Sequence, residues 1–269
     1  ELNKLQTDYP DYVNIFDIGN NDQNRPILGI KIEHPAIEIN NKASYLVVGA
    51  HHGNERLSAN LALEFAKKLV AEFLSTNSDY PNLINRVFYI IPVLNISGYN
   101  TNRRYELNEK GYYIDSNRDY PDVCVQEPHF QLKSTQNIIN FIEQNEIIGA
   151  VTIHGYIGTF TYPWGIYTTN TKTPDNEFLK YISYEGAKFN NYRVGTHADV
   201  IYPAAGTFED WVYYAYGVWA NLVELQYNPN LNADSKMLLT YFNLLPQERS
   251  HNHDHLGTCT KTRGPIKAR

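Results

Sequence analysis

Long apolar runs are missing from this sequence of 269 residues. A membrane-spanning helix needs about 20 consecutive, mostly apolar residues, whereas runs such as Tyr89 to Leu94 have only the length of a strand. The sequence also lacks a basic tract, and its formal net charge is -6. These absences predict a chain with no membrane span and no nucleic-acid partner.

Cysteine is scarce, because Cys124 and Cys259 are the only two and lie far apart in the sequence. They either pair in an oxidising compartment or remain two unrelated thiols. The chain also lacks an internal repeat, a low-complexity block and a linker rich in Pro, Gly or Ser, which favours a single domain. No signal peptide is visible, but the numbering begins at Glu1 instead of Met, so this absence says little about the compartment.

Hydrophobic residues make up 42% of the chain, which is enough for a sizeable core. Short apolar runs alternate with segments whose apolar residues recur at helical spacing, as in Leu61, Phe65 and Leu69. This alternation predicts one α/β domain over residues 1–245, with a mixed, mostly parallel, twisted sheet and helices on both faces. Residues 246–269 are predicted to form a polar extension. The predicted strands are 12–17, 27–32, 45–48, 87–94, 147–153 and 218–225, and the predicted helices are 57–73, 130–144, 176–189, 207–216 and 233–244.

Polar side chains follow two of the predicted strands at the point where each strand ends. His52 and Glu55 lie three residues apart just before a helix, and this spacing selects His52 over His51 as the partner of Glu55. His154 ends another buried strand. Two imidazoles and one carboxylate at the carboxyl edge of a sheet would form a zinc site with one open position. The alternatives are a glutamate favoured by the helix dipole and a hydrogen-bonded core histidine.

Two further charged residues stand in unusual contexts. Glu224 lies inside the apolar run 218–225, where a carboxylate is costly to bury unless it is paired or functional. It is either a general base close to a metal, a member of a buried ion pair or a capping residue at the end of the strand. Arg118, in the long polar stretch 95–122, has the fork geometry that binds a terminal carboxylate, with Asn117 beside it. The alternative for Arg118 is a solvated loop position.

Together these elements resemble the zinc carboxypeptidases related to carboxypeptidases A and B. The resemblance covers about residues 45–225, and the joint order of the elements is specific although no single one is decisive. In chain order they read His52-x-x-Glu55; Asn95-Ile-Ser-Gly98; Arg103-Arg104; Asp115-x-Asn117-Arg118-Asp119-Tyr120; Thr152-Ile-His154-Gly-Tyr156; Tyr162-Pro-Trp-Gly165; Tyr202-Pro-Ala-Ala-Gly206; Asp210-Trp211; and Val223-Glu224-Leu225.

The resemblance implies a carboxypeptidase-like fold with about eight strands and a hydrolase that removes the C-terminal residue of a peptide. It implies one Zn²⁺ per chain, bound by His52, Glu55 and His154. Asp115 would accept a hydrogen bond from the far nitrogen of His52 and so hold its tautomer. Glu224 would activate the attacking water and pass its proton to the leaving amine.

The resemblance also implies how a substrate is held. Asn117 and Arg118 would anchor its C-terminal carboxylate, and Tyr202 would close over it. An arginine should stabilise the oxyanion; both Arg103 and Arg104 lie in the right stretch, and Arg104 is preferred.

The sequence departs from the family pattern in two of these motifs. The usual Asn-Pro-Asp-Gly reads Asn95-Ile-Ser-Gly98, and the usual Asn-Arg-Asn reads Asn117-Arg118-Asp119. Asp119 adds a negative charge beside the carboxylate anchor, which weakens carboxylate binding unless a neighbouring group absorbs it.

Glu209 indicates the side-chain preference. In the family the matching position lies at the base of the pocket for the departing side chain, where an acid suits Lys or Arg, unless Glu209 turns away and pairs elsewhere. An amidase or carboxypeptidase that trims diaminopimelate-containing cell-wall peptides is an alternative, because diaminopimelate also presents an amine. A second alternative is a non-catalytic binding module with this fold, although the complete ligand set and Glu224 argue against it.

The expected partner is a peptide with a free C-terminal carboxylate. The oligomeric state stays open, and a monomer is compatible with the sequence. The resemblance and the non-Met start favour a secreted or periplasmic location. No pro-domain is recognised before the motifs, and the first forty or so residues fit an opening helix and two strands. His34, His129 and His197 have no partner motif, so no role is predicted for them.

Overall fold

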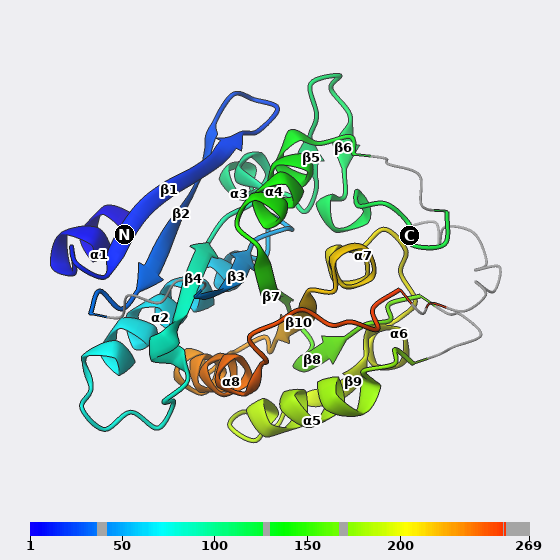
Figure 1. The fold of residues 1–269 in the computed structure, drawn as a ribbon. Coiled ribbons are helices and arrows are strands. Elements are labelled where there is room, and N and C mark those ends of the chain that lie inside the picture. Colours follow the sequence, from blue (N-terminus) through cyan, green and yellow to red (C-terminus); the bar gives the residue numbers. More distant parts are fainter. Residues whose placement is uncertain (37–41, 126–129, 167–171, 255, 257–269) are drawn as a thin grey trace.

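The computed structural model describes residues 1–36, 42–125, 130–166, 172–254 and 256. Its centre is one mixed, twisted sheet of eight strands, which confirms the predicted α/β fold class (Figure 1). Four neighbouring strand pairs are parallel and three are antiparallel. In spatial order the strands are β1 (Val13–Asn20), β2 (Pro26–Glu33), β4 (Arg86–Ile91), β3 (Ala43–Gly49), β7 (Ile147–Gly155), β10 (Trp219–Leu225), β8 (Thr159–Tyr162) and β9 (Arg193–Thr196).

Helices cover both faces of the sheet (Figure 1). One face carries α2 (Arg56–Leu74), α5 (Asn176–Ala187) and α8 (Leu231–Leu244), and the other carries α4 (Lys133–Gln144) and α7 (Phe208–Tyr216). The smaller elements are α1 (Leu2–Asp8), η1 (Leu83–Asn85), α3 (Ile96–Thr101), the two-stranded sheet of β5 (Glu106–Leu107) and β6 (Tyr113–Ile114), η2 (Ser116–Arg118) and α6 (His197–Val200).

Strand β3 shows why the central strands read as apolar runs. Tyr45 and Val47 point into the core beneath α2 and α8, and Leu46 and Val48 point into the core beneath α4 and α7. All four side chains are fully buried. A strand that is covered on both faces has no solvent side, so its sequence shows no polar alternation. The first polar residues after this strand, His51 and His52, stand at its carboxyl end.

Several element boundaries differ from the prediction for identifiable reasons. Strand β4 ends at Ile91 instead of residue 94, because Pro92 has no N–H for the ladder. Helix α4 begins at Lys133 instead of residue 130, since the N–H groups of Gln131 and Leu132 donate to the Asp119 carboxylate instead. The stretch 95–122 has no long-range periodicity because it contains only short elements, namely α3, β5, β6 and η2. Strands β8 and β9, four residues each, were not predicted.

The described part of the predicted C-terminal extension lies against the domain. The Trp219 indole donates to Glu248 O (2.8 Å), Ser250 N donates to Gly217 O (2.8 Å), and Arg249 Nε donates to Ile147 O (2.9 Å). The division at residue 245 stays a prediction. His129 and Cys259 lie outside the described residues. Within the described ranges, no helix is both long and apolar enough to cross a membrane.

Candidate metal centre and active site

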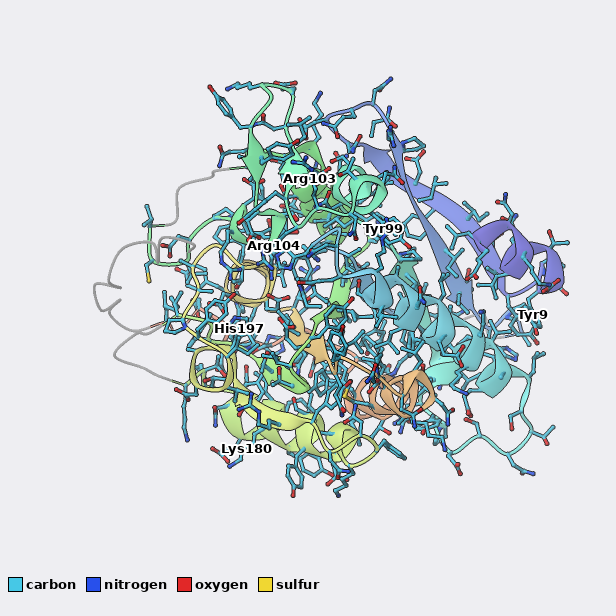
Figure 2. All side chains as sticks on the ribbon, turned by 180° about the vertical axis from the view of Figure 1, so that it is seen from behind. Tyr9, Tyr99, Arg103, Arg104, Lys180 and His197 are labelled. Atoms are coloured by element: carbon cyan, nitrogen blue, oxygen red, sulfur yellow. The ribbon has the colours of Figure 1, made fainter. Side chains whose placement is uncertain are left out.

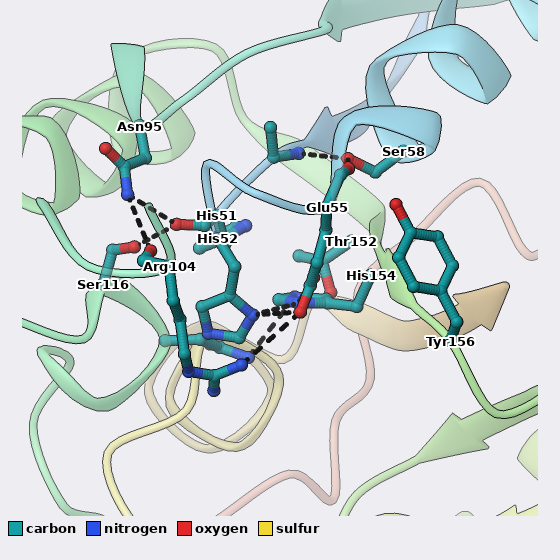
Figure 3. A network of polar contacts seen from close by, with 12 residues as sticks. His51, His52, Glu55, Ser58, Asn95, Arg104, Ser116, Thr152, His154 and Tyr156 are labelled. Atoms are coloured by element: carbon teal, nitrogen blue, oxygen red, sulfur yellow. Dashed lines mark hydrogen bonds and ion pairs between the residues drawn. The ribbon is translucent and has the colours of Figure 1, made fainter. Parts of the chain in front are cut away.

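Three predicted metal ligands converge at the carboxyl end of the sheet (Figure 3). His52 Nδ1 lies 2.9 Å from Glu55 Oε1 and 3.0 Å from His154 Nδ1, and His154 Nδ1 lies 3.1 Å from Glu55 Oε2. All three side chains are buried. Their positions follow from topology, because β3 and β7 are parallel neighbours, so the residues at their carboxyl ends meet at one edge.

The donor set fits a zinc ion. Zinc takes histidine nitrogen and carboxylate oxygen at about 2.0–2.2 Å, which places two ligands of a tetrahedral site roughly 3.4 Å apart. The separations of 2.9 to 3.1 Å between the three ligand atoms are close to that value. His52 Nε2 donates to Asp115 Oδ1 (3.0 Å), so His52 Nδ1 is the nitrogen left with a lone pair for a cation.

The loop that carries His52 and Glu55 depends on a close backbone approach. A Cβ atom at Gly53 would lie 2.0 Å from the carbonyl carbon of Gly98, in α3, so only glycine fits there. Gly53 N also donates to Arg104 O (3.3 Å). Glu55 occupies the N-cap of α2 without capping it, since its carboxylate turns to the histidines instead. The amino end of α2 therefore lacks a side-chain cap, because the Glu55 carboxylate takes part in the ligand set instead.

Arg104 is the arginine at the site. Its Nε donates to Asp115 Oδ2 (3.1 Å), and a second nitrogen lies 3.4 Å from Glu55 Oε1. Figure 2 labels both Arg103 and Arg104. Arg103 instead places its guanidinium 5.0 Å from the ring centroid of Tyr113. The geometry agrees with the preference for Arg104. Hydrogen bonding to His52, together with the charges of His52 and Arg104, outweighs burial and holds the pKa of Asp115 well below its usual range.

Glu224 stands beside the ligand set on the neighbouring strand. It pairs in register with His154 between the parallel strands β10 and β7, and residues in register point to the same face. Burial raises the pKa of Glu224 to about 7, while the charge of His154 lowers it and that of Glu55 raises it. A carboxylate with a pKa near neutrality beside a metal set is suited to accept and return a proton.

The predicted carboxylate anchors lie next to the ligands. Asn117 Oδ1 accepts a hydrogen bond from Phe208 N (2.9 Å), and Asn117 Nδ2 lies 3.5 Å from His154 Nε2. The Arg118 guanidinium donates to the Tyr202 hydroxyl (3.0 Å). Tyr202 is 45% exposed, so its ring stands at the surface above the site. The structure therefore places Asn117, Arg118 and Tyr202 close to one another, and their role as carboxylate anchors stays a prediction.

Asp119 does not compete for the anchor. Its buried carboxylate accepts hydrogen bonds from Gln131 N (2.9 Å), Leu132 N (3.0 Å) and the Thr135 hydroxyl (2.6 Å). These donors absorb the negative charge on the side of α4. Asp119, which departs from the family's Asn-Arg-Asn pattern, thus binds the segment at the amino end of α4.

Glu209 is buried at 3% exposure beneath the site. The Thr152 hydroxyl donates to its Oε1, and Thr152 stands two residues before His154 on β7, on the same face of the sheet. The other oxygen, Oε2, has no hydrogen-bond partner among the described residues. Glu209 therefore turns toward the strand that carries a metal ligand.

Two supporting residues were not given a role from the sequence. His51 is fully buried, bonds through Nε2 to the Tyr120 hydroxyl (2.9 Å), and stacks on His154 with ring centroids 5.4 Å apart. Asn95 Nδ2 donates to His51 O (3.2 Å) and Arg104 O (3.1 Å), which ties the ligand loop to the arginine loop (Figure 3). Asn95 belongs to one of the motifs that carry the family resemblance. For His51, nothing in the sequence indicates whether the side chain is buried or exposed to solvent.

Comparison with known proteins places the chain in a family. The family described as zinc carboxypeptidase matches residues 1–252 of the chain. Carboxypeptidase O of Bos taurus is 25% identical over 243 residues, which cover 78% of this chain and 64% of that protein. An inactive metallocarboxypeptidase of Schizosaccharomyces pombe is 26% identical over 254 residues, which cover 77% of this chain and 50% of that protein. The chain thus spans less than two thirds of the length of these relatives.

Solved structures share the fold. Thrombin-activatable fibrinolysis inhibitor aligns with a TM-score of 0.78 at 19% identity, covering 90% of this chain and 70% of the other. A murein-tripeptide amidase from Escherichia coli O157 aligns with a TM-score of 0.53 at 15% identity, covering 87% of this chain and 92% of the other. These likenesses establish the architecture, and the match over residues 1–252 establishes the relationship. The chain belongs to the zinc carboxypeptidase family.

Proposed function

We propose that this protein is a zinc-dependent carboxypeptidase that hydrolyses the C-terminal peptide bond of its substrate. The observation that carries the proposal is the convergence of His52, Glu55 and His154 to within hydrogen-bonding distance of one another, with Glu224 in register beside His154. A catalytic zinc site has three protein ligands and one open position. A structural zinc site would have four protein ligands. The family that matches the chain is described as zinc carboxypeptidase, which also favours zinc as the ion.

The side chains divide the reaction between them. Zinc held by the three ligands would polarise the scissile carbonyl and lower the pKa of a bound water. Glu224 takes a proton from the attacking water and returns it to the leaving amine, so that one C–N bond breaks and one C–O bond forms. Arg104 stabilises the negative charge on the carbonyl oxygen. Asp115 orients both His52 and Arg104, since its two oxygens bind one each.

Arg118, together with Asn117 and Tyr202, would recognise the free C-terminus of the substrate. A guanidinium binds a carboxylate through two parallel N–H groups, which favours a free C-terminus over an internal peptide bond. In the structure the guanidinium donates to the Tyr202 hydroxyl. A substrate carboxylate would replace this contact and draw Tyr202 over itself.

We further propose a preference for substrates that end in Lys or Arg. Glu209 supports it, because its carboxylate is buried and one of its oxygens has no partner in the described structure. A buried acid left unpaired penalises an apolar side chain and rewards a cationic one.

An amidase that acts on diaminopimelate-containing cell-wall peptides is the second candidate. It is favoured by the shared fold with the murein-tripeptide amidase, whose chain is 92% covered. The same carboxylate of Glu209 would pair with the side-chain amine of diaminopimelate. A binding module without activity, like the relative named inactive, is disfavoured because the three ligand residues and Glu224 are all present here.

The test is a comparison of kcat/KM for N-acylated dipeptides that end in Arg, Lys, Phe or Glu, and for a tripeptide that ends in diaminopimelate. The zinc-loaded wild type and Glu209→Gln are assayed side by side. We expect the wild type to favour the basic dipeptides, and Glu209→Gln to reduce that preference about tenfold or more, since a charged hydrogen bond is lost.

Each other outcome excludes one part of the proposal. A strong preference for Phe would exclude the basic pocket, and turnover of the diaminopimelate substrate alone would favour the amidase. No turnover of any substrate by zinc-loaded protein would support the binding module.

A secreted or periplasmic location is also proposed, on the family relationship alone. Fractionation of the source cells, with immunodetection of the protein in each fraction, tests it. Detection only in the cytosolic fraction would contradict it.

A further inference from the structure

His197 is a buried histidine to which the proposed reaction gives no role. It is the first residue of α6, is 7% exposed, and has no hydrogen-bond partner for Nε2 within the described ranges. Burial, together with the charges of Arg118 and His154, lowers its pKa to about 3. The ring is therefore neutral, and one of its nitrogens is an acceptor. Buried polar atoms rarely lack a partner, so Nε2 calls for an explanation.

The surroundings of His197 are those of the proposed carboxylate anchor. Its ring meets the ring of Tyr202 edge-on with centroids 6.0 Å apart, and Tyr202 accepts a hydrogen bond from Arg118. A substrate's carboxylate and side chain both leave the same Cα atom. Groups that contact the departing side chain must therefore lie beside those that bind the carboxylate. His197, labelled in Figure 2, stands in such a place because its ring contacts that of Tyr202.

Gly165 links His197 to the neighbourhood of Glu209. A Cβ atom at Gly165 would lie 3.5 Å from His197 Cδ2 and 3.2 Å from Asp210 Oδ2. Asp210 is held there by Gly165 N (2.8 and 2.9 Å), and Glu209 is the preceding residue of α7. Both His197 Nε2 and Glu209 Oε2 are buried polar atoms without a partner among the described residues. One of these atoms belongs to His197, whose ring lies beside Gly165, and the other belongs to Glu209, which precedes Asp210 in α7. Two unpaired buried atoms in this one region suit a ligand with several donors.

We propose that His197 is a second hydrogen-bond acceptor for the cationic head group of the departing residue, acting together with Glu209. This inference rests on the proposed carboxypeptidase function. An ammonium group has three N–H donors and a guanidinium has five, whereas one free carboxylate oxygen leaves most of them without a partner. Unpaired buried donors weaken binding. A neutral imidazole supplies a further acceptor without adding a charge beside Arg118.

Two substitutions separate hydrogen bonding from packing. His197→Phe keeps a ring against Tyr202 but removes the acceptor, whereas His197→Gln keeps a polar atom near the Nε2 position but removes the ring. The measured quantity is the ratio of kcat/KM for a dipeptide that ends in Arg to that for one that ends in Phe. We expect His197→Phe to lower the ratio about tenfold to a hundredfold, and His197→Gln to keep it within about threefold of the wild-type ratio.

The control is His251→Gln, an exposed histidine of the C-terminal segment, which should leave the ratio unchanged. Thermal unfolding and zinc content of each variant exclude misfolding. The inference is overturned if His197→Phe keeps the wild-type ratio, or if His197→Gln lowers it as much as His197→Phe does. The former result would mean that a ring without an acceptor suffices, so that His197 only supports the ring of Tyr202. The latter would mean that an acceptor at this position does not sustain the preference.

A binding measurement keeps this inference separate from the proposed function. Titration of zinc-loaded protein with free L-arginine by calorimetry needs no turnover. We expect His197→Phe to weaken arginine binding about tenfold or more relative to wild type. If no substrate is hydrolysed yet His197→Phe weakens arginine binding, the proposed function fails and the role of His197 stands. If peptides that end in Arg are cleaved and arginine binds both proteins equally, only the role of His197 fails.

Discussion

At the scale of single residues, the site is a set of charges whose protonation is controlled by burial and by close partners. Asp115 and Glu55 have lowered pKa values because the histidines hydrogen-bond to them and outweigh burial, and burial raises the pKa of Glu224 to about 7. Three carboxylates within one site thus differ in protonation. The two with low pKa values orient or bind, and the one with a raised pKa is suited to move a proton.

Glu224→Gln should separate metal binding from catalysis. The amide keeps the shape of the side chain but cannot accept the proton of the attacking water, so kcat should fall by about 10²- to 10⁴-fold. Zinc content, measured by atomic absorption, should stay near one ion per chain, because Glu224 is not among the three ligands. Activity within tenfold of wild type would remove Glu224 from the role of general base.

The two neighbouring arginines provide a matched pair. Arg104→Ala should lower kcat by about 10²- to 10³-fold, as loss of an oxyanion donor does. Arg103→Ala should change kcat less than about threefold, because its guanidinium lies over the Tyr113 ring instead of near Glu55 and Asp115. Single-turnover and steady-state kinetics on one basic dipeptide make the comparison. Equal losses in the two variants would contradict the assignment.

At the scale of elements, the segments that connect strands and helices carry most of the site, while the long helices and strands form the core. The link between β3 and α2 holds two ligands, and the β5–β6 hairpin is flanked by Arg104 on one side and Asp115 on the other, which bind each other. This ion pair closes the hairpin at the active site. Glu106, a buried acid in β5, fixes the hairpin to the domain, because its oxygens accept hydrogen bonds from Asn21 (3.3 Å) and Ser134 (2.6 Å).

Glu106 predicts a pH dependence of stability. Burial raises its pKa to about 8, compared with about 4.3 in an unfolded chain. Between these values the folded state binds more protons than the unfolded state, so stability falls as pH rises. Relative to Glu106→Gln, which is neutral at every pH, the wild type should lose up to about 1.4 kcal/mol per pH unit between about pH 4.5 and 8. Urea unfolding of both proteins across that range measures it, and parallel curves would refute the burial of an ionisable group here.

At the scale of the whole molecule, a bound ion would join segments far apart in the chain. His52 and Glu55 follow β3, and His154 ends β7 about a hundred residues later. An ion that binds only the folded arrangement stabilises it.

Zinc binding should therefore appear as thermal stabilisation. At a free zinc concentration about 100 times Kd, the free energy of unfolding should rise by about 2.7 kcal/mol, which raises Tm by roughly 5–10 °C for a chain of this size. Calorimetry of chelated and zinc-loaded protein measures the shift. In His154→Asn most of it should disappear, while His251→Gln should keep it. An equal shift in wild type and His154→Asn would place the ion elsewhere.

The linear pattern of residues predicted the core elements because they are long and strongly periodic. Helix α2 was expected over 57–73 and spans Arg56–Leu74, and β7 was expected over 147–153 and spans Ile147–Gly155. Shorter pieces escaped, since β8 and β9 owe their conformation to pairing with β10 and with each other. Four residues carry too little pattern to reveal such pairing.

For the site, the order of residues alone indicates which residue types stand at strand ends and how they are spaced, because an acid or histidine beside an apolar run is visible in the chain. Which of these residues contact one another depends on the folded arrangement. It brought Arg104 rather than Arg103 to Asp115, gave Asp119 to the start of α4, and buried His197 beside Tyr202. Such contacts depend on the order of the strands in the sheet and on the path of the loops, which bring together residues about a hundred positions apart. A local pattern in the sequence does not contain this information.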